Sequence, residues 1–209
     1  MKLKVCGITS LEQLVQLEEM GVDYAGMIFY EKSPRYAYEN LKADADKIKG
    51  LQVKKVGVFV NAEEAEIREA IGEFDLDAVQ LHGDETPEKA LLLKDRVEVI
   101  KVFRMTGEEK IEELIAPFKD ACDYYLFDTA TKDYGGSGKQ FDWSVLKNVA
   151  IEKPFFLSGG IGAADAEMLK NFEHPNLFAA DVNSRFETAP GVKDMKLIEA
   201  FKRSLYEQG

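Results

Sequence analysis

The sequence predicts a single α/β domain over residues 1–209, folded as a compact (β/α)8 TIM barrel. Short apolar runs rich in Val, Ile, Phe and Tyr alternate with amphipathic segments rich in Glu, Lys, Leu and Ala. Several of these runs are apolar almost throughout, which is typical of strands buried on both faces. Eight strand and helix pairs over 209 residues give about 26 residues per unit, which is short but sufficient for a barrel.

Eight expected strands follow one another along the chain. They are Leu3–Ile8, Tyr24–Phe29, Lys55–Val60, Ala78–Leu81, Val99–Phe103, Tyr124–Asp128, Pro154–Leu157 and Leu177–Val182. An open doubly wound sheet is the alternative, but it rarely needs eight units. The first strand also leads into Cys6-Gly7-Ile8-Thr9, which is not the glycine pattern of a dinucleotide site. No stretch reads as a linker between domains.

Helices are expected to begin where a polar residue precedes an amphipathic segment. Ser10 stands before Leu11, Asn61 before Ala62 and Thr86 before Pro87. The helical pattern is weakest at Tyr38–Lys49, because polar residues interrupt its apolar face.

Composition and charge exclude several classes of protein. The formal net charge of −11 argues against binding to nucleic acid, since affinity for phosphate backbones depends on Lys and Arg. No run of about 20 apolar residues could span a membrane. The N-terminus lacks the apolar core of a signal peptide. Two cysteines, Cys6 and Cys122, are too few for a disulfide framework or a zinc site, which indicates a cytoplasmic protein with free thiols.

Polar residues stand at nearly every expected strand end. In a barrel the carboxyl ends of the strands form the active-site face, so these residues are the candidates for a site. They are Cys6, Arg35, Gln80, His82, Asp128, Asp181, Asn183, Ser184 and Arg185.

Each candidate also has a purely structural interpretation. Cys6 could be a small buried apolar residue, Asp128 and Asp181 could cap turns, His82 could be a hydrogen-bonded structural histidine, and Arg35 could be a solvated surface residue. Position alone leaves both interpretations open.

The most specific local signal is Ser158-Gly159-Gly160-Ile161-Gly162, directly after the seventh strand. Glycines let backbone N–H groups approach an anion, and a following helix N-terminus would add a favourable dipole. Loops after strands seven and eight of barrels frequently bind phosphate, and the matching loop here is Asn183-Ser184-Arg185. A small phosphorylated substrate is therefore expected.

A second glycine-rich segment contains Gly135, Gly136, Ser137 and Gly138. It lacks the ending of a phosphate-binding P-loop and follows the sixth strand, so a lid over the site is expected there. A plain connection without a role is the alternative.

Six motifs in order resemble those of the phosphoribosylanthranilate isomerase family, over residues 4 to about 194. They are Lys4-Val5-Cys6-Gly7-Ile8-Thr9, Gly57-Val58-Phe59-Val60-Asn61, Val79-Gln80-Leu81-His82-Gly83-Asp84-Glu85, Phe127-Asp128-Thr129 with Gly135-Gly136-Ser137-Gly138-Lys139, Leu157-Ser158-Gly159-Gly160-Ile161, and Asp181-Val182-Asn183-Ser184.

The resemblance implies an Amadori rearrangement in tryptophan biosynthesis. N-(5-phosphoribosyl)anthranilate would become 1-(2-carboxyphenylamino)-1-deoxyribulose 5-phosphate. It implies that Cys6 is the general base, that Asp128 is the general acid, and that Arg35 binds the anthranilate carboxylate. A raised pKa of Asp128 and a partly ionised Cys6 would suit these roles. No metal or organic cofactor is implied, and the sequence leaves a monomer and a homodimer equally open.

One residue departs from the family pattern. The residue after Asn183-Ser184 is frequently glycine in the family but is Arg185 here, which weakens its assignment to the phosphate site.

Two other functions stay open from sequence. One is an epimerase-like phosphosugar barrel, which would need metal ligands where this chain has only His82 and His174. The other is a barrel that binds a phosphorylated metabolite without catalysis.

Overall fold

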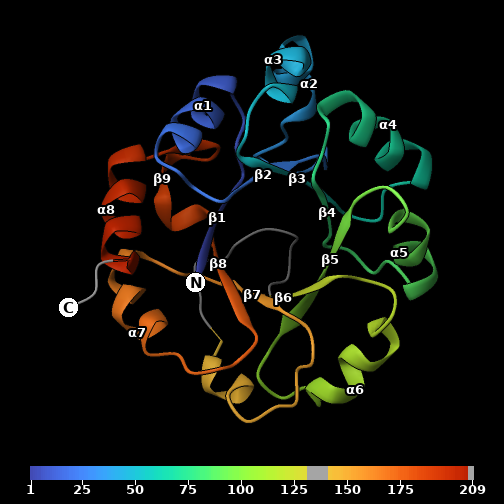
Figure 1. The fold of residues 1–209 in the computed structure, drawn as a ribbon, viewed down its shortest axis with the longest axis vertical. Helices are drawn as coiled ribbons and strands as arrows, with labels where there is room; N and C mark the ends of the chain where they lie inside the picture. Colours follow the sequence, from blue (N-terminus) through green and yellow to red (C-terminus); the bar gives the residue numbers. More distant parts are fainter. Residues whose placement is uncertain (131–140, 207–209) are drawn as a thin grey trace.

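The computed structural model describes residues 1–130 and 141–206, and in them eight parallel strands close into a barrel (Figure 1). Each strand pairs with the next in sequence, and β8 pairs with β1. The strands are β1 (Lys2–Cys6), β2 (Tyr24–Ile28), β3 (Lys54–Phe59), β4 (Ala78–Leu81), β5 (Glu98–Met105), β6 (Tyr124–Thr129), β7 (Phe155–Leu157) and β8 (Leu177–Val182). The predicted barrel is confirmed; β5 is longer than expected at both ends.

Helices surround the barrel (Figure 1). They are α1 (Leu11–Glu19), α2 (Tyr38–Leu41), α3 (Ala45–Lys49), α4 (Glu64–Phe74), α5 (Pro87–Leu93), α6 (Ile111–Ile115), α7 (Ala166–Lys170) and α8 (Met195–Tyr206). Between β6 and β7 the described residues form only a 3₁₀ helix, Trp143–Leu146. A hairpin of β9 (Glu187–Ala189) and β10 (Val192–Lys193) precedes α8. Across both described ranges, every helix falls short of the length and apolar character that crossing a membrane requires.

Two of the three predicted helix caps are confirmed. The side chains of Ser10 and Thr86 accept hydrogen bonds from backbone amides in the first turns of α1 and α5. The third prediction is wrong, because Glu63 caps α4 through a reciprocal pair with Glu66. Asn61 instead has a φ of +53° and accepts a hydrogen bond from the backbone of the loop after β4. Asparagine tolerates this left-handed conformation better than most residues.

The weak helical segment after β2 is broken, as its sequence pattern suggested. A 3₁₀ turn, Lys42–Asp44, separates α2 from α3. The segment is held to the barrel by Leu41 and Ile48, which are fully buried.

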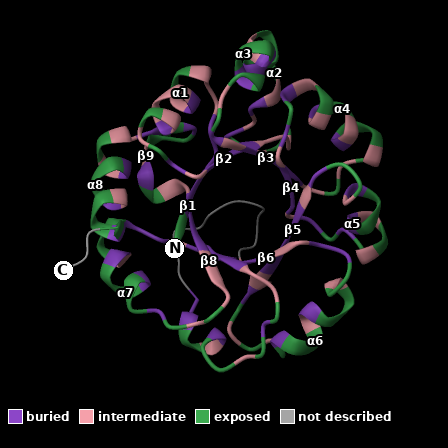
Figure 2. Cartoon of the chain, viewed as in Figure 1, coloured by how far each residue is buried: buried purple, intermediate pink, exposed green. Residues whose placement is uncertain are grey.

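The apolar core has two layers, one between strands and helices and one inside the barrel. Figure 2 shows the strands mostly buried and the helices exposed on their outer faces. Side chains alternate along a strand, so neighbours point to opposite layers. On β1, Leu3 and Val5 join the outer layer. Lys4 and Cys6 therefore face the interior of the barrel, toward its carboxyl end.

We predict that Phe74→Ala lowers the free energy of unfolding by about 3–5 kcal/mol. Phe74 is fully buried, with its ring centroid 5.2 Å from that of Phe29 and 5.7 Å from that of Tyr38. Chemical denaturation measures the change. The control Leu92→Ala, at an exposed position of α5, should change stability by less than about 0.5 kcal/mol. Equal effects of the two variants would contradict the assignment of this aromatic cluster to the core.

Candidate active site

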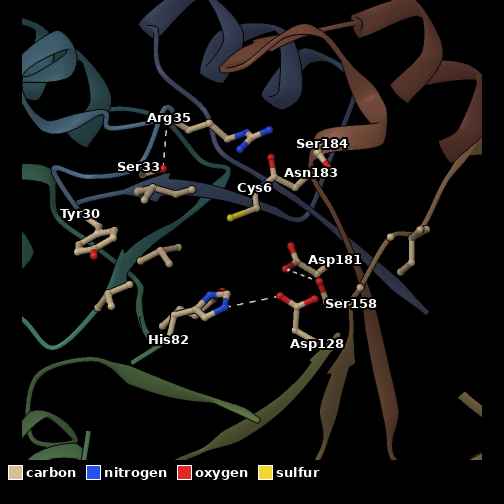
Figure 3. A pocket seen from close by; sticks show the side chains of 17 residues that line it. Cys6, Tyr30, Ser33, Arg35, His82, Asp128, Ser158, Asp181, Asn183 and Ser184 are labelled. Atoms are coloured by element: carbon tan, nitrogen blue, oxygen red, sulfur yellow. Dashed lines mark hydrogen bonds and ion pairs between the residues drawn. The ribbon is translucent and has the colours of Figure 1, made fainter. Parts of the chain in front are cut away.

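A pocket opens at the carboxyl end of the barrel and gathers most of the predicted site residues (Figure 3). Those that line it are Cys6, Arg35, Gln80, His82, Asp128, Gly159, Gly160, Asp181, Asn183 and Ser184. They come from positions spread over 179 residues of sequence, and the parallel closure of the strands brings them together. In Figure 3, His82 and Asp128 face each other and Cys6 lies on the neighbouring wall.

Cys6 ends β1 and its thiol is almost completely buried. A glycine on the next strand makes room for it, since a Cβ on Gly26 would lie 2.8 Å from the Cys6 sulfur. Burial raises the pKa of Cys6, and the charge of Lys4 opposes that rise without cancelling it. Cys6 is therefore mainly a thiol at neutral pH, and thiolate formation needs further help.

Asp128 lies near the end of β6, and its side chain is 16% exposed. Burial and the nearby Asp181 carboxylate raise the pKa of Asp128 to about 6. One carboxylate oxygen accepts a hydrogen bond from the Thr129 amide at 2.8 Å, which limits the rise. Asp128 thus keeps its proton up to a higher pH than an exposed aspartate does, as a general acid requires.

His82 is a neutral neighbour of Asp128. Its Nε2 lies 3.6 Å from Asp128 Oδ2, and burial together with the charges of Lys4, Arg104 and Lys101 lowers the pKa of His82 to about 3. On its other side, Nδ1 lies 3.4 Å from the side-chain nitrogen of Gln80. If the amide donates there, Nε2 carries the hydrogen and points toward Asp128. His82 then acts as an uncharged polar contact.

The loop that carries His82 is fixed by a buried carboxylate. Glu85 accepts hydrogen bonds from the backbone amides of Asn61 at 2.8 Å and Gly83 at 3.2 Å. Lys101 of β5 lies 2.9 Å from Glu85 and also donates to the Gly83 carbonyl. These contacts tie the ends of β3 and β4 together and hold His82 in place.

Arg35 is clamped rather than solvated. Its Nε and Nη2 both donate to the Glu187 carboxylate, at 2.7–3.0 Å. Lys193 lies 2.6 Å from the same carboxylate and 2.7 Å from Asn183 Oδ1. Two cations therefore share one carboxylate beside the pocket, which leaves a local excess of positive charge. Nη1 takes no part in the clamp.

The glycine loop after β7 has the backbone that its sequence predicts. Gly159 and Gly160 have φ values of +91° and +68°, which favour glycine. A Cβ on Gly159 would also collide with the Thr129 side chain, at 2.3 Å.

The expected helix N-terminus after this loop is weaker than predicted. A 3₁₀ turn, Ala163–Asp165, precedes α7, which has five residues. The amide of Gly162 donates to the Asp165 carboxylate at 2.7 Å, so an acidic side chain already takes part of this terminus. An anion in the pocket would therefore depend on the glycine backbone more than on a helix dipole.

Arg185 is exposed and does not line the pocket. Its side chain lies over Gly162, where a Cβ would come within 3.2 Å of the arginine Cδ. Arg185 thus borders the outer side of the glycine loop.

The predicted lid residues Gly135, Gly136, Ser137 and Gly138 lie outside the described residues.

Within residues 1–130 and 141–206, no three His, Cys, Asp or Glu side chains converge as a metal site would require. Cys122 is buried just before β6, and burial raises its pKa to about 12, as expected of an unreactive thiol.

Sequence reasoning missed three charged residues near the pocket. Lys4 interrupts an apolar strand at a position two residues from Cys6, and this alternation was the available signal. Glu187 and Lys193 carried no such signal, because only the β9–β10 hairpin returns them to the pocket rim.

Comparison with known proteins identifies a family. Residues 3–204 match the model of the N-(5'-phosphoribosyl)anthranilate isomerase family. An enzyme of that name from Parabacteroides distasonis is 40% identical over 206 residues, covering 96% of this chain and 91% of the relative.

Solved structures agree in fold. A phosphoribosylanthranilate isomerase from Thermotoga maritima has a TM-score of 0.86 and 35% identity, with 98% of each chain covered. Another from that organism, monomers generated from a dimeric form, has a TM-score of 0.82 and 34% identity, covering 98% of this chain and 97% of that one. A third, in complex with reduced 1-(o-carboxyphenylamino)-1-deoxyribulose 5-phosphate, has a TM-score of 0.81 and 32% identity, with the same coverage.

We predict that Asp128→Asn stabilises the fold above pH 7. Because the pKa of Asp128 is raised from 3.8 to about 6 by folding, above that pH the fold must hold an already ionised carboxylate in a site that disfavours its charge. The variant removes this cost, which is about 3 kcal/mol.

Urea denaturation at a series of pH values measures the effect. The gain should be full above about pH 7, decline between pH 6 and 4, and vanish below pH 4, where the wild-type carboxyl is protonated in both states. A gain that does not change with pH would contradict the raised pKa.

Proposed function

The chain belongs to the N-(5'-phosphoribosyl)anthranilate isomerase family, and from this premise we propose that Cys6 and Asp128 act as its general base and general acid. It is therefore an isomerase, and the Amadori rearrangement of tryptophan biosynthesis is its reaction. The observation that carries the assignment of roles is the joint burial of an acid with raised pKa and a thiol in one pocket.

The substrate has three polar parts, and the pocket offers a partner for each. The phosphate would bind the backbone of Gly159 and Gly160 with Asn183 and Ser184 opposite. A relative binds a reduced product with the same phosphate and carboxyphenyl groups.

A sugar hydroxyl would satisfy Gln80. Its side-chain oxygen is buried and has no hydrogen-bond partner among the described residues. A buried acceptor of this kind normally has a partner, so a bound hydroxyl group would complete it.

The anthranilate carboxylate would bind Arg35. Glu187 fixes the guanidinium through Nε and Nη2 and leaves Nη1 outside the clamp. The added charge of Lys193 offsets Glu187, so the region attracts an anion although the whole chain is acidic.

The first chemical step is ring opening. Asp128 in its protonated form gives its proton to the furanose oxygen as the C1–O bond breaks, and the nitrogen lone pair forms a C1=N iminium. A carboxyl group with a pKa of about 6 keeps a useful protonated fraction near neutral pH.

The second step is removal of the C2 proton. The Cys6 thiolate takes this proton, and the C–H electron pair forms the C1=C2 bond of an enolamine while the iminium nitrogen is neutralised. The enolamine then tautomerises: C1 gains one proton, the C2 hydroxyl loses one, and no net proton is consumed. The positive iminium favours the thiolate at the moment when it is needed.

We predict that Cys6→Ala and Asp128→Asn each lower kcat/KM by at least about a hundredfold, because each removes one proton-transfer group. Cys122→Ala is the matched control, since Cys122 is a buried thiol remote from the pocket. Turnover is measured as loss of the fluorescence of the substrate's anthranilate group. The rate is corrected for spontaneous decay of the substrate.

Circular dichroism should show that all three variants fold. Wild-type turnover in a folded Cys6→Ala or Asp128→Asn variant would contradict the assigned role. Phosphometabolite binding without turnover in the wild type would favour a non-catalytic barrel.

We also predict that Arg35→Met raises KM about 10- to 100-fold for the anthranilate substrate, through loss of a charge-assisted contact. Lys193 remains to pair Glu187 in this variant. Initial rates should be compared with the aniline analogue, which lacks the carboxyl group. The variant should leave KM for the analogue nearly unchanged, and an equal loss on both substrates would contradict carboxylate binding by Arg35.

A further inference from the structure

Four neighbouring strands place polar groups in an arc around the barrel rim. Asp128 lies on β6, Ser158 directly follows β7, Asp181 lies on β8, and Lys4 and Cys6 lie on β1. Because β6, β7, β8 and β1 are consecutive in the closed sheet, the arc connects the two proposed catalytic groups. Its middle is a charged pair that the mechanism above does not use.

That pair is Lys4 and Asp181. Lys4 Nζ lies 2.8 Å from Asp181 Oδ1, and the two side chains are 0% and 6% exposed. The residues are direct partners in the β1–β8 register. Burial alone lowers the pKa of Lys4, but the charges of Asp181 and Cys6 outweigh it and the net pKa is raised, so Lys4 stays an ammonium.

A buried pair of this kind is a poor source of stability. Removing two charges from water costs about as much as their attraction returns, and apolar replacements are frequently as stable. The pair therefore calls for a reason other than folding.

The orientation of the Lys4–Asp181 pair supplies a reason for its presence. Lys4 shares the inward face of β1 with Cys6, two residues away. Asp181 lies on the other side, where its Oδ2 accepts a hydrogen bond from Ser158 Oγ at 3.4 Å, and Ser158 in turn interacts with Asp128. The cation is next to the base, and the anion is toward the acid.

We propose that the buried Lys4–Asp181 pair is an oriented positioning element that favours a thiolate at Cys6 and a protonated carboxyl at Asp128. Its electrostatic part concerns only this chain, and its catalytic consequence rests on the function proposed above.

The effects on each group follow this orientation. At Cys6, the lowering of the pKa by Lys4 exceeds the raising by Asp181, and Lys193 lowers it further. At Asp128, the raising by Asp181 exceeds the lowering by Lys4. His82, whose Nε2 lies 3.6 Å from Asp128 Oδ2, is neutral.

The catalytic consequence concerns a minor ionisation state. The competent form has Asp128 protonated and Cys6 ionised, although the thiol has the higher pKa of the two. The population of this form falls tenfold for each unit by which the two pKa values separate. By lowering one pKa and raising the other, the pair brings them closer and enlarges the competent fraction.

The test replaces Lys4 and Asp181 and measures the pKa values of Cys6 and Asp128 directly. We would prepare Lys4→Met, Asp181→Asn and the double variant, with cysteine Cβ and aspartate Cγ labelled with carbon-13. Titration by NMR then gives the pKa of Cys6 and of Asp128 without substrate, and Cys6→Ser and Asp128→Asn identify the two signals. Lys2→Met is the matched control, because Lys2 lies on the same strand but is half-exposed and pairs with Asp23.

In the double variant we expect the pKa of Cys6 to rise and that of Asp128 to fall, with their gap widening by about one unit and kcat/KM falling about tenfold. Lys4→Met alone should raise the pKa of Cys6, and Asp181→Asn alone should lower it. Lys2→Met should move neither group. A single variant that leaves a buried charge unpaired and does not fold is replaced by the net-neutral double variant, which carries the test.

Unchanged pKa values in the double variant, or shifts of both groups in the same direction, would overturn the proposal. A widened gap with unchanged kcat/KM would overturn its catalytic consequence. If the wild type does not turn over the substrate at all, the proposed function fails, while the two titrations still decide the electrostatic orientation.

Discussion

Closure of eight parallel strands into one ring is the constraint on which the rest of this structure depends. In a closed parallel ring every strand must deliver its carboxyl end to the same rim, so residues from Cys6 to Ser184 meet there whatever their distance in sequence. The inner apolar layer fills the ring below that rim, which gives the pocket an apolar floor. Charges at the floor consequently act on one another with little screening by water.

Burial above this apolar floor helps one of the two proposed catalytic groups and hinders the other. Burial keeps a proton on Asp128, as an acid requires, but it also keeps a proton on Cys6, which must lose one. Desolvation alone therefore cannot assign the two roles. A directional field can, and we propose that the Lys4–Asp181 pair supplies one across the arc between the two groups. In the proposed mechanism, the positive iminium intermediate would add to the field on the side of the thiolate.

Sequence was sufficient for whatever depends on local pattern. Apolar strands and glycines with required φ values are local, and so Gly159 and the strand order could be predicted. The prediction that Asn61 caps a helix was wrong because asparagine suits both a helix cap and a left-handed turn. The hydrogen bond from the loop after β4 holds Asn61 in the turn conformation. The partner of Lys4 is 177 residues away, and no local pattern indicates which buried charge will meet which.

Direct conversion of the substrate tests the central claim, which is that this barrel rim carries out the isomerisation. Freshly prepared N-(5-phosphoribosyl)anthranilate would be mixed with the wild-type chain, and the product would be separated and identified by mass and by its ketose chemistry. The account predicts that the carboxyphenylamino-deoxyribulose phosphate accumulates with enzyme concentration, faster than spontaneous breakdown releases anthranilate. Release of anthranilate alone, at the rate found in buffer with folded protein present, would contradict it.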